Sequence, residues 1–262
     1  MDLHVEVAGE GPAVLLLHGL TATHRYVVMG SRRLERDGHR VIAYDARGHG
    51  ASDPAPAPDR YAYDDLAADA LRVLDDHGVE RAVLAGASMG AHTALRVALD
   101  HPERVAGLVL ATPAHVPGRE RDERALARWD RLADGLAGGG VDGFLAAYRF
   151  DDLPEQWRDT VRTVTRQRLA QHARPEAVAD ALRIVPRSAP FASFDDLAAI
   201  DAPTVVVGSR DEADPTHPLE AARRYAAAIP GARLAVEEPG ESPIAWRGAR
   251  LSQLIADVAA GA

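Results

Sequence analysis

The sequence contains no cysteine among its 262 residues. This absence excludes disulfides, thiolate metal sites and cysteine nucleophiles, so any nucleophile must be an oxygen or a nitrogen atom. The sequence also lacks a run close to the roughly 20 apolar residues that a membrane-spanning helix needs. Its first residues, MDLHVEVAGEG, show no basic stretch followed by an apolar one, as a secretory signal would. These absences predict no membrane association and a cytoplasmic location.

Several kinds of partner and cofactor have no counterpart in the sequence. The net charge of −9 opposes binding to nucleic acid, whose phosphates would be repelled. The sequence has no G-x-G-x-x-G after its first apolar run, no H-E-x-x-H and no G-x-x-x-x-G-K. Asp45 and His49 lie close together, but two possible ligands without a third make a weak metal site. We therefore expect a small-molecule substrate, no cofactor and no metal.

The hydrophobic pattern predicts an α/β fold with a mostly parallel central sheet and helices on both faces. Short apolar runs alternate with helical patterns along the chain, as in parallel sheets covered by helices. Most of these runs are apolar on both faces, as strands between two helical layers should be. The predicted strands cover 13–19, 40–45, 81–86, 106–111, 202–208 and 232–238. The predicted helices cover 26–37, 64–77, 89–100, 218–229 and 247–259.

One segment interrupts this alternation. From about 117 to 190 the sequence carries helical patterns with the GGG of 138–140 between them. We predict a helical lid over 117–190, inserted into a core domain made of 1–116 and 191–262. Its aromatic residues favour a mainly apolar pocket for an uncharged ester; they are Trp129, Phe144, Tyr148, Phe150 and Trp157, with Phe191 and Phe194 following.

The motif GASMG at 86–90 matches G-x-S-x-G and lies between a predicted strand and a predicted helix. In that context Ser88 is a candidate nucleophile, because a strained strand-to-helix turn exposes the serine hydroxyl at the carboxyl edge of the sheet. Gly86 and Gly90 would allow the strand and the helix to approach closely. The N-terminus of the following helix would favour a developing negative charge.

With this motif, LLLHGLTATH (15–24) and YDARGHGASD (44–53) make the chain resemble the α/β-hydrolase superfamily, in its lid-bearing, serine esterase-like branch. The resemblance implies the α/β-hydrolase fold. It also implies that the backbone N–H groups of Leu20 and Met89 form an oxyanion hole. His18 and His49 would hold their loops by hydrogen bonds rather than transfer protons.

In this family the acid follows the penultimate strand and the histidine follows the last one. Asp211 supplies the acid at the expected place, and Asp214, a turn further on, is an alternative. The last loop reads EPGESPIAW, so Glu241 stands where the family has histidine. Glu237 and Glu238, at the end of the last strand, would replace Glu241 if the loop were shifted, but solvent-facing or edge roles are expected for them.

Three hypotheses address this substitution. In the first, Glu241 is the base of a Ser88–Glu241–Asp211 array, with its pKa raised by burial and by the neighbouring carboxylate. In the second, a histidine from elsewhere replaces the missing one; the candidates are His115, His217, His24 and His92. In the third, the protein binds ligands or catalyses a non-hydrolytic reaction. The sequence favours the first, and predicts a serine hydrolase of small or medium apolar carboxylic esters.

Overall fold

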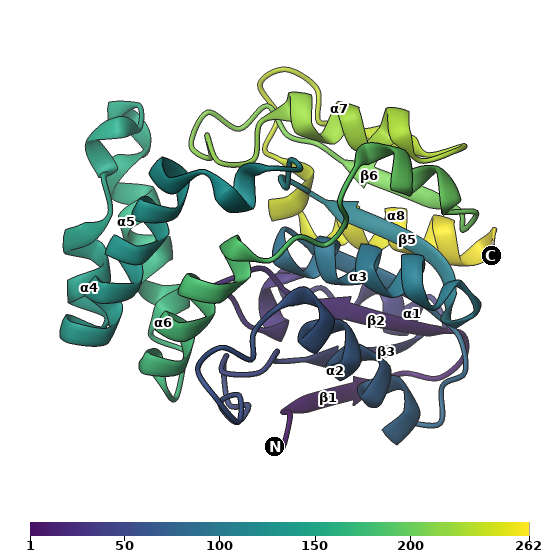
Figure 1. Ribbon diagram of the computed structural model, residues 1–262. Coiled ribbons are helices and arrows are strands. Elements are labelled where there is room, and N and C mark those ends of the chain that lie inside the picture. The colour runs from purple at the N-terminus through teal and green to yellow at the C-terminus, as the bar shows by residue number, and fades with distance from the viewer. Residues whose placement is uncertain (262) are drawn as a thin grey trace.

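A seven-stranded sheet runs through the middle of the computed structural model, which describes residues 1–261 (Figure 1). Its strands are β1 (Val5–Ala8), β2 (Ala13–Leu17), β3 (Arg40–Tyr44), β4 (Ala82–Ala87), β5 (Val105–Ala111), β6 (Thr204–Val207) and β7 (Arg233–Ala235). They lie in the order β1-β3-β2-β4-β5-β6-β7. Among these strands, only β1 runs antiparallel to its neighbour; all the other pairs are parallel. The predicted mostly parallel sheet is confirmed.

Helices cover both faces of the sheet, as predicted. They are α1 (Arg33–Arg36), α2 (Tyr63–Asp76), α3 (Met89–Asp100), α7 (Leu219–Ala228) and α8 (Gly248–Ala260). In β2, Leu15 and Leu17 belong to the apolar core shared with α2, α3 and α7, whereas Val14 and Leu16 belong to the core shared with α1 and α8. Because successive side chains of a strand point to opposite faces, the continuous apolar run supplies both cores.

Two predictions near the N-terminus need correction. The helix predicted over 26–37 is helical only at α1, because the backbone takes left-handed values before it, with φ of 48° at Met29 and 71° at Gly30. A right-handed helix cannot pass through such values. In addition, β1 pairs with β3 at the sheet edge, although no strand was predicted there.

Three further helices separate β5 from β6 in the chain and lie to one side of the sheet (Figure 1). They are α4 (Glu123–Ala147), α5 (Glu155–Leu169) and α6 (Pro175–Ile184). Within α4 the chain breaks at Gly140, whose φ is 57°, and folds back so that Gly135 and Gly143 lie against each other. These inserted helices share an apolar cluster against which Leu20 packs. They therefore cover the loop that follows β2.

The division of the chain at 117 and 190, and the role of these helices as a lid, stay predictions. No helix within residues 1–261 is both long enough and apolar enough to cross a membrane.

Candidate active site

Ser88 lies in the turn between β4 and α3, with φ of 49° and ψ of −110°. A residue with a side chain rarely adopts this conformation, and such strain is concentrated at functional sites. Two glycines make the turn possible. A Cβ on Gly86 would lie 2.3 Å from Gly90, and a Cβ on Gly90 would lie 2.0 Å from the carbonyl oxygen of Leu17. The close approach inferred from GASMG is thus present, and Ser88 lies at the carboxyl edge of the sheet.

The side chain that reaches Ser88 is His217, from the loop after β6. Its Nε2 lies 2.8 Å from Ser88 Oγ, and its Nδ1 lies 2.6 Å from Oδ2 of Asp214. An ionised Asp214 can only accept, so Nδ1 carries the proton and Nε2 accepts the hydrogen bond from the Ser88 hydroxyl. Ser88, His217 and Asp214 therefore form one hydrogen-bonded chain.

Asp214 is held in its charged form. Burial raises the pKa of its carboxyl, but hydrogen bonds from His217 and Thr216 outweigh this and lower the pKa to about 2. The Thr216 hydroxyl donates to Asp214 Oδ1 at 2.6 Å. Asp214 consequently stays ionised at neutral pH.

Within residues 1–261, no hydrogen bond joins Asp211 to His217. Asp211 is therefore outside the hydrogen-bonded chain that reaches Ser88. Oδ1 of Asp211 accepts from the Ala213 N–H at 2.9 Å, and Oδ2 accepts from Trp246 Nε1–H at 3.3 Å. The first contact closes a turn within the loop after β6, and the second joins that loop to the segment after β7. The alternative acid, Asp214, occupies the place beside histidine that the sequence favoured for Asp211.

The structure also corrects the expectation that Glu241 lies beside Ser88. The Glu241 side chain is exposed and pairs with Arg247 at 2.9 Å. Its backbone N–H donates to Glu238, within a turn where Gly240 has φ of 86°. This local turn and the surface ion pair hold Glu241 outside the hydrogen-bonded chain. The position that matches the family's histidine in sequence is therefore not the position that reaches the serine in space.

Glu237 does not face solvent as expected, since only 4% of its surface is exposed. Its carboxylate accepts hydrogen bonds from the Ser209 hydroxyl, at 3.1 Å, and from the Arg210 N–H. Ser209 Oγ in turn accepts from the Asp211 N–H at 3.0 Å. The end of β7 thus fixes the start of the loop that carries Asp214 and His217. The sequence gave no signal that Glu237 would hold this loop, because a single acidic residue after a strand forms no recognisable motif.

The other histidine candidates make contacts elsewhere. Nε2 of His92 accepts from the N–H groups of Ala114 and His115, each at 3.1 Å, and burial lowers the pKa of the His92 ring well below its usual value. The His115 ring packs edge-on against Phe191, and burial lowers its pKa as well. His24 bonds to Asp45 at 2.8 Å. Of the four candidates, the structure brings only His217 to Ser88.

A short-range signal for this arrangement exists in the sequence. Asp214 and His217 lie three residues apart in DPTHP, with a proline after the aspartate and another after the histidine. Three-residue spacing in a tight turn allows a direct side-chain hydrogen bond. Pro215 lies between the two residues and Pro218 follows His217, so a tight turn brings the two side chains together.

The loop after β2 lies against the serine. A Cβ on Gly19 would lie 3.6 Å from Ser88 Cβ. His18 fixes this loop, since its Nδ1–H donates to the Gly19 carbonyl at 2.8 Å and its Nε2 accepts from the Ala46 N–H at 2.9 Å. The holding role inferred for His18 agrees with these contacts. Within residues 1–261, the N–H groups of Leu20 and Met89 have no hydrogen-bond partner.

The buried His18 ring predicts an acid-sensitive fold. Burial lowers the pKa of His18 from 6.5 to about 4, so the unfolded chain takes up a proton between these values and the folded chain does not. The free energy of unfolding is therefore expected to fall by about 3 kcal/mol from this residue as the pH decreases through this range. Urea unfolding at several pH values measures this loss. The loss of unfolding free energy on acidification should be smaller in His18→Gln than in the parent, and unchanged in a variant of the exposed His101. An equal loss in His18→Gln and in the parent would contradict the prediction.

A small cavity of about 40 Å³ adjoins the site. Its lining residues are Thr112, Ser209, Asp211, Asp214, His217, Pro243, Ala245 and Trp246.

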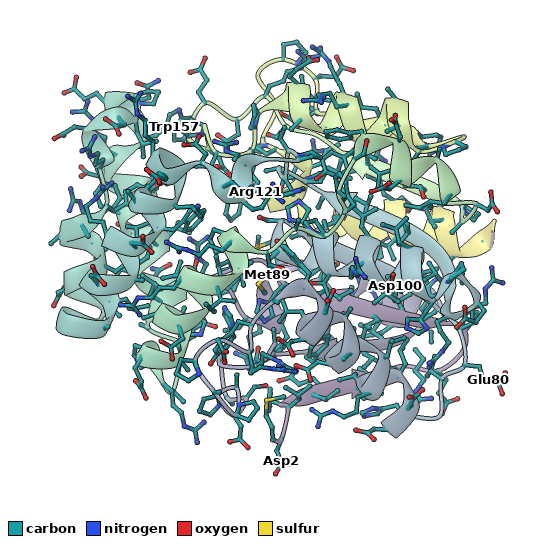
Figure 2. All side chains as sticks on the ribbon, viewed as in Figure 1. Asp2, Glu80, Met89, Asp100, Arg121 and Trp157 are labelled. Atoms are coloured by element: carbon teal, nitrogen blue, oxygen red, sulfur yellow. The ribbon has the colours of Figure 1, made fainter. Side chains whose placement is uncertain are left out.

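Met89, labelled in Figure 2, lies in the interior where α3 begins, whereas Trp157 lies on the inserted helices and is 41% exposed. Phe144, Phe150 and Phe191 are buried. The aromatic residues therefore serve mainly to pack the inserted helices and their junction with the core.

A serine, a histidine and an aspartate in this geometry, on a parallel sheet, are the features by which serine hydrolases are recognised. Comparison with known proteins identifies the family. Residues 12–248 match the alpha/beta hydrolase fold family, and the chain belongs to this family.

Several relatives of this chain are named as hydrolases. A 2-hydroxy-6-oxononadienedioate/2-hydroxy-6-oxononatrienedioate hydrolase of Pseudomonas putida is 32% identical over 247 residues, which are 90% of this chain and 83% of that protein. The "Putative carbamate hydrolase RutD" of Variovorax paradoxus (strain S110) is 45% identical over 112 residues, only 42% of either chain. A thermophilic esterase from Thermogutta terrifontis has a similar structure, with a TM-score of 0.79, 28% identity and coverage of 97% of this chain and 92% of the other.

Proposed function

We propose that the protein is a serine hydrolase that cleaves small or medium carboxylic esters with Ser88, His217 and Asp214. The observation that carries the proposal is the pair of contacts made by His217, at 2.8 Å to Ser88 and 2.6 Å to Asp214. A protein that only bound ligands would have no need for a strained serine aligned with a base.

Each residue has a defined role in the proposed reaction. Ser88 Oγ attacks the ester carbonyl carbon while His217 Nε2 takes its proton. The backbone N–H groups of Leu20 and Met89 hold the oxyanion that forms. As the intermediate collapses, His217 returns the proton to the leaving alcohol, and the acyl group stays on Ser88. Water, activated by His217, then releases the carboxylic acid and restores Ser88.

Asp214 acts through His217. Its carboxylate accepts the Nδ1–H, which keeps Nε2 free to accept the serine proton, and its negative charge stabilises the imidazolium that follows. Glu241 has no part in the proposed reaction steps. The Ser88–Glu241–Asp211 array is thereby replaced by the second of the three hypotheses, with Asp214 in place of Asp211.

Ester bonds are the proposed substrate for two reasons. The Thermogutta terrifontis relative is an esterase. The cavity of about 40 Å³ beside His217 has room for only a few waters, since each water needs roughly 10–15 Å³. This size favours a small group on at least one side of the bond.

Active-site labelling tests the proposal. A fluorophosphonate should form one adduct, which peptide mass spectrometry places on Ser88, and labelling should abolish hydrolysis of p-nitrophenyl butyrate. Ser88→Ala should acquire no adduct while keeping the parent's thermal unfolding curve. Unchanged hydrolysis after complete labelling would contradict the mechanism. An unlabelled parent without esterase activity would favour a ligand-binding protein.

A further inference from the structure

Three potential metal ligands meet near β1, the strand at one edge of the sheet (Figure 1). His4 precedes β1, Glu6 lies within it, and His24 follows β2. Nε2 of His24 lies 3.2 Å from Glu6 Oε1, and Nε2 of His4 lies 3.7 Å from the same oxygen. One ligand atom from each of the three residues lies within 4.8 Å of the others.

His4 and Glu6 are brought together by strand geometry. Residues two apart in an extended chain point to the same side, so both side chains face the loop that contains His24. The rings of His4 and His24 have centroids 5.1 Å apart. The cluster therefore joins the edge of the sheet to the segment that also contains Leu20.

The orientation of His24 is the observation that points to a ligand. Its Nδ1 bonds to Asp45 Oδ1 at 2.8 Å, and its backbone N–H donates to the same oxygen at 2.9 Å. The Asp45 carboxylate is fixed on its other side by the Ala51 N–H at 3.0 Å. A carboxylate that holds one ring nitrogen and leaves the other free is the usual support of a metal-bound histidine.

The second ring nitrogen of His24 is buried and faces the carboxylate of Glu6. Only 8% of His24 is exposed, and its Nε2 lies 3.2 Å from Glu6 Oε1, an ion-pair contact without the geometry of a hydrogen bond. Buried nitrogen atoms of this kind are normally satisfied. Ligands at about 2.0–2.1 Å from a tetrahedral ion lie about 3.3 Å apart, and the distances from Glu6 to the two histidines are close to this separation.

We propose that His4, Glu6 and His24 form a site for a divalent transition metal ion of the zinc type, with two imidazole nitrogens and one carboxylate oxygen as ligands and water as the fourth. Two histidines and a glutamate are a donor set that zinc accepts. This site is independent of the proposed ester hydrolysis. By tying β1 to the loop after β2, the metal stabilises the folded protein.

A competing explanation for the cluster is a simple ion pair. A protonated His24 would pair with Glu6 and with Asp45 and would need no metal. The two explanations differ in His4, which the ion pair does not require, and in proton release, because a metal binds only the neutral imidazole.

Zinc titration of the untagged full chain separates the explanations. Isothermal calorimetry with ZnCl2 at pH 7.5 should show one equivalent bound with proton release, seen as a dependence of the heat on the buffer. The melting temperature should rise with zinc concentration, and Co²⁺ should give the absorption of a tetrahedral site. His4→Ala and Glu6→Gln alter side chains that are 38% and 52% exposed, so both variants should fold. Each should weaken zinc binding at least tenfold.

His101→Ala is the matched control. His101 lies 3.5 Å from Glu103 in an exposed histidine–glutamate pair, outside the three-ligand cluster. Its loss should leave zinc affinity unchanged. The proposal is overturned if the parent binds no zinc, or if His4→Ala and Glu6→Gln bind it as tightly as the parent does. Ester hydrolysis is measured in parallel, and its presence or absence does not bear on this result.

Discussion

In a His217→Ala variant, kcat for ester hydrolysis is expected to fall by about 10⁶-fold, the loss typical of removing the base from a serine triad. The reason is that the contact at 2.8 Å from His217 Nε2 to Ser88 Oγ provides the acceptor for the serine proton. The residual rate would come from substrate binding and from the oxyanion N–H groups. Steady-state hydrolysis of p-nitrophenyl butyrate measures the effect, with thermal unfolding to establish that the variant is folded.

Glu241→Gln is the matched control for this prediction. Glu241 is exposed and pairs with Arg247, and such surface pairs contribute only about 0–1 kcal/mol to stability. We expect kcat of Glu241→Gln within about twofold of the parent. The opposite result, activity lost in Glu241→Gln and kept in His217→Ala, would restore the glutamate as the base and reject the mechanism proposed above.

Asp214→Asn is expected to lower kcat by about 10⁴-fold. An amide that donates to Nδ1 instead of accepting from it moves the ring proton to Nε2, where it blocks proton transfer from Ser88. The amide also removes the negative charge that stabilises the imidazolium. Because the pKa of Asp214 is lowered to about 2, the parent carboxylate is charged throughout the neutral range and the full effect should be seen there.

Asp211→Asn separates the two acids of the loop. Asp211 accepts from Ala213 and Trp246, so its replacement should affect kcat only through the loop, by less than about tenfold, the equivalent of one hydrogen bond. Measuring kcat and KM for both variants over pH 6–9 tests this. A larger loss in Asp211→Asn than in Asp214→Asn would return the orienting role to the residue that the sequence favoured.

The sequence predicted the parts of the protein that depend on local pattern. Continuous apolar runs gave the strands from β2 to β6 and the coverage of both sheet faces, since a strand between two helical layers must be apolar on both sides. GASMG gave the strained turn at Ser88, because Gly86 and Gly90 are needed wherever strand and helix approach so closely. Local pattern failed for α1, where left-handed residues interrupt a helical periodicity.

Which side chains lie beside Ser88 does not follow from local pattern. Family order pointed to Glu241, but hydrogen bonding across 129 residues of sequence joins Ser88 to His217. The parallel sheet brings the loops after β4 and β6 to one edge, as the sequence implies. Which side chain then reaches the serine depends on how each loop folds: Glu237 holds one loop, whereas an ion pair with Arg247 keeps Glu241 at the surface.

By itself, then, the sequence determined the sheet, its helical layers and the strained turn at Ser88, because these follow from periodicity and from glycine at fixed positions. Only the tertiary structure decided that His217 and Asp214 complete the site and that His4, Glu6 and His24 meet at the sheet edge. Such contacts join residues from different loops, and their formation depends on side-chain directions and loop conformations that the packed fold sets.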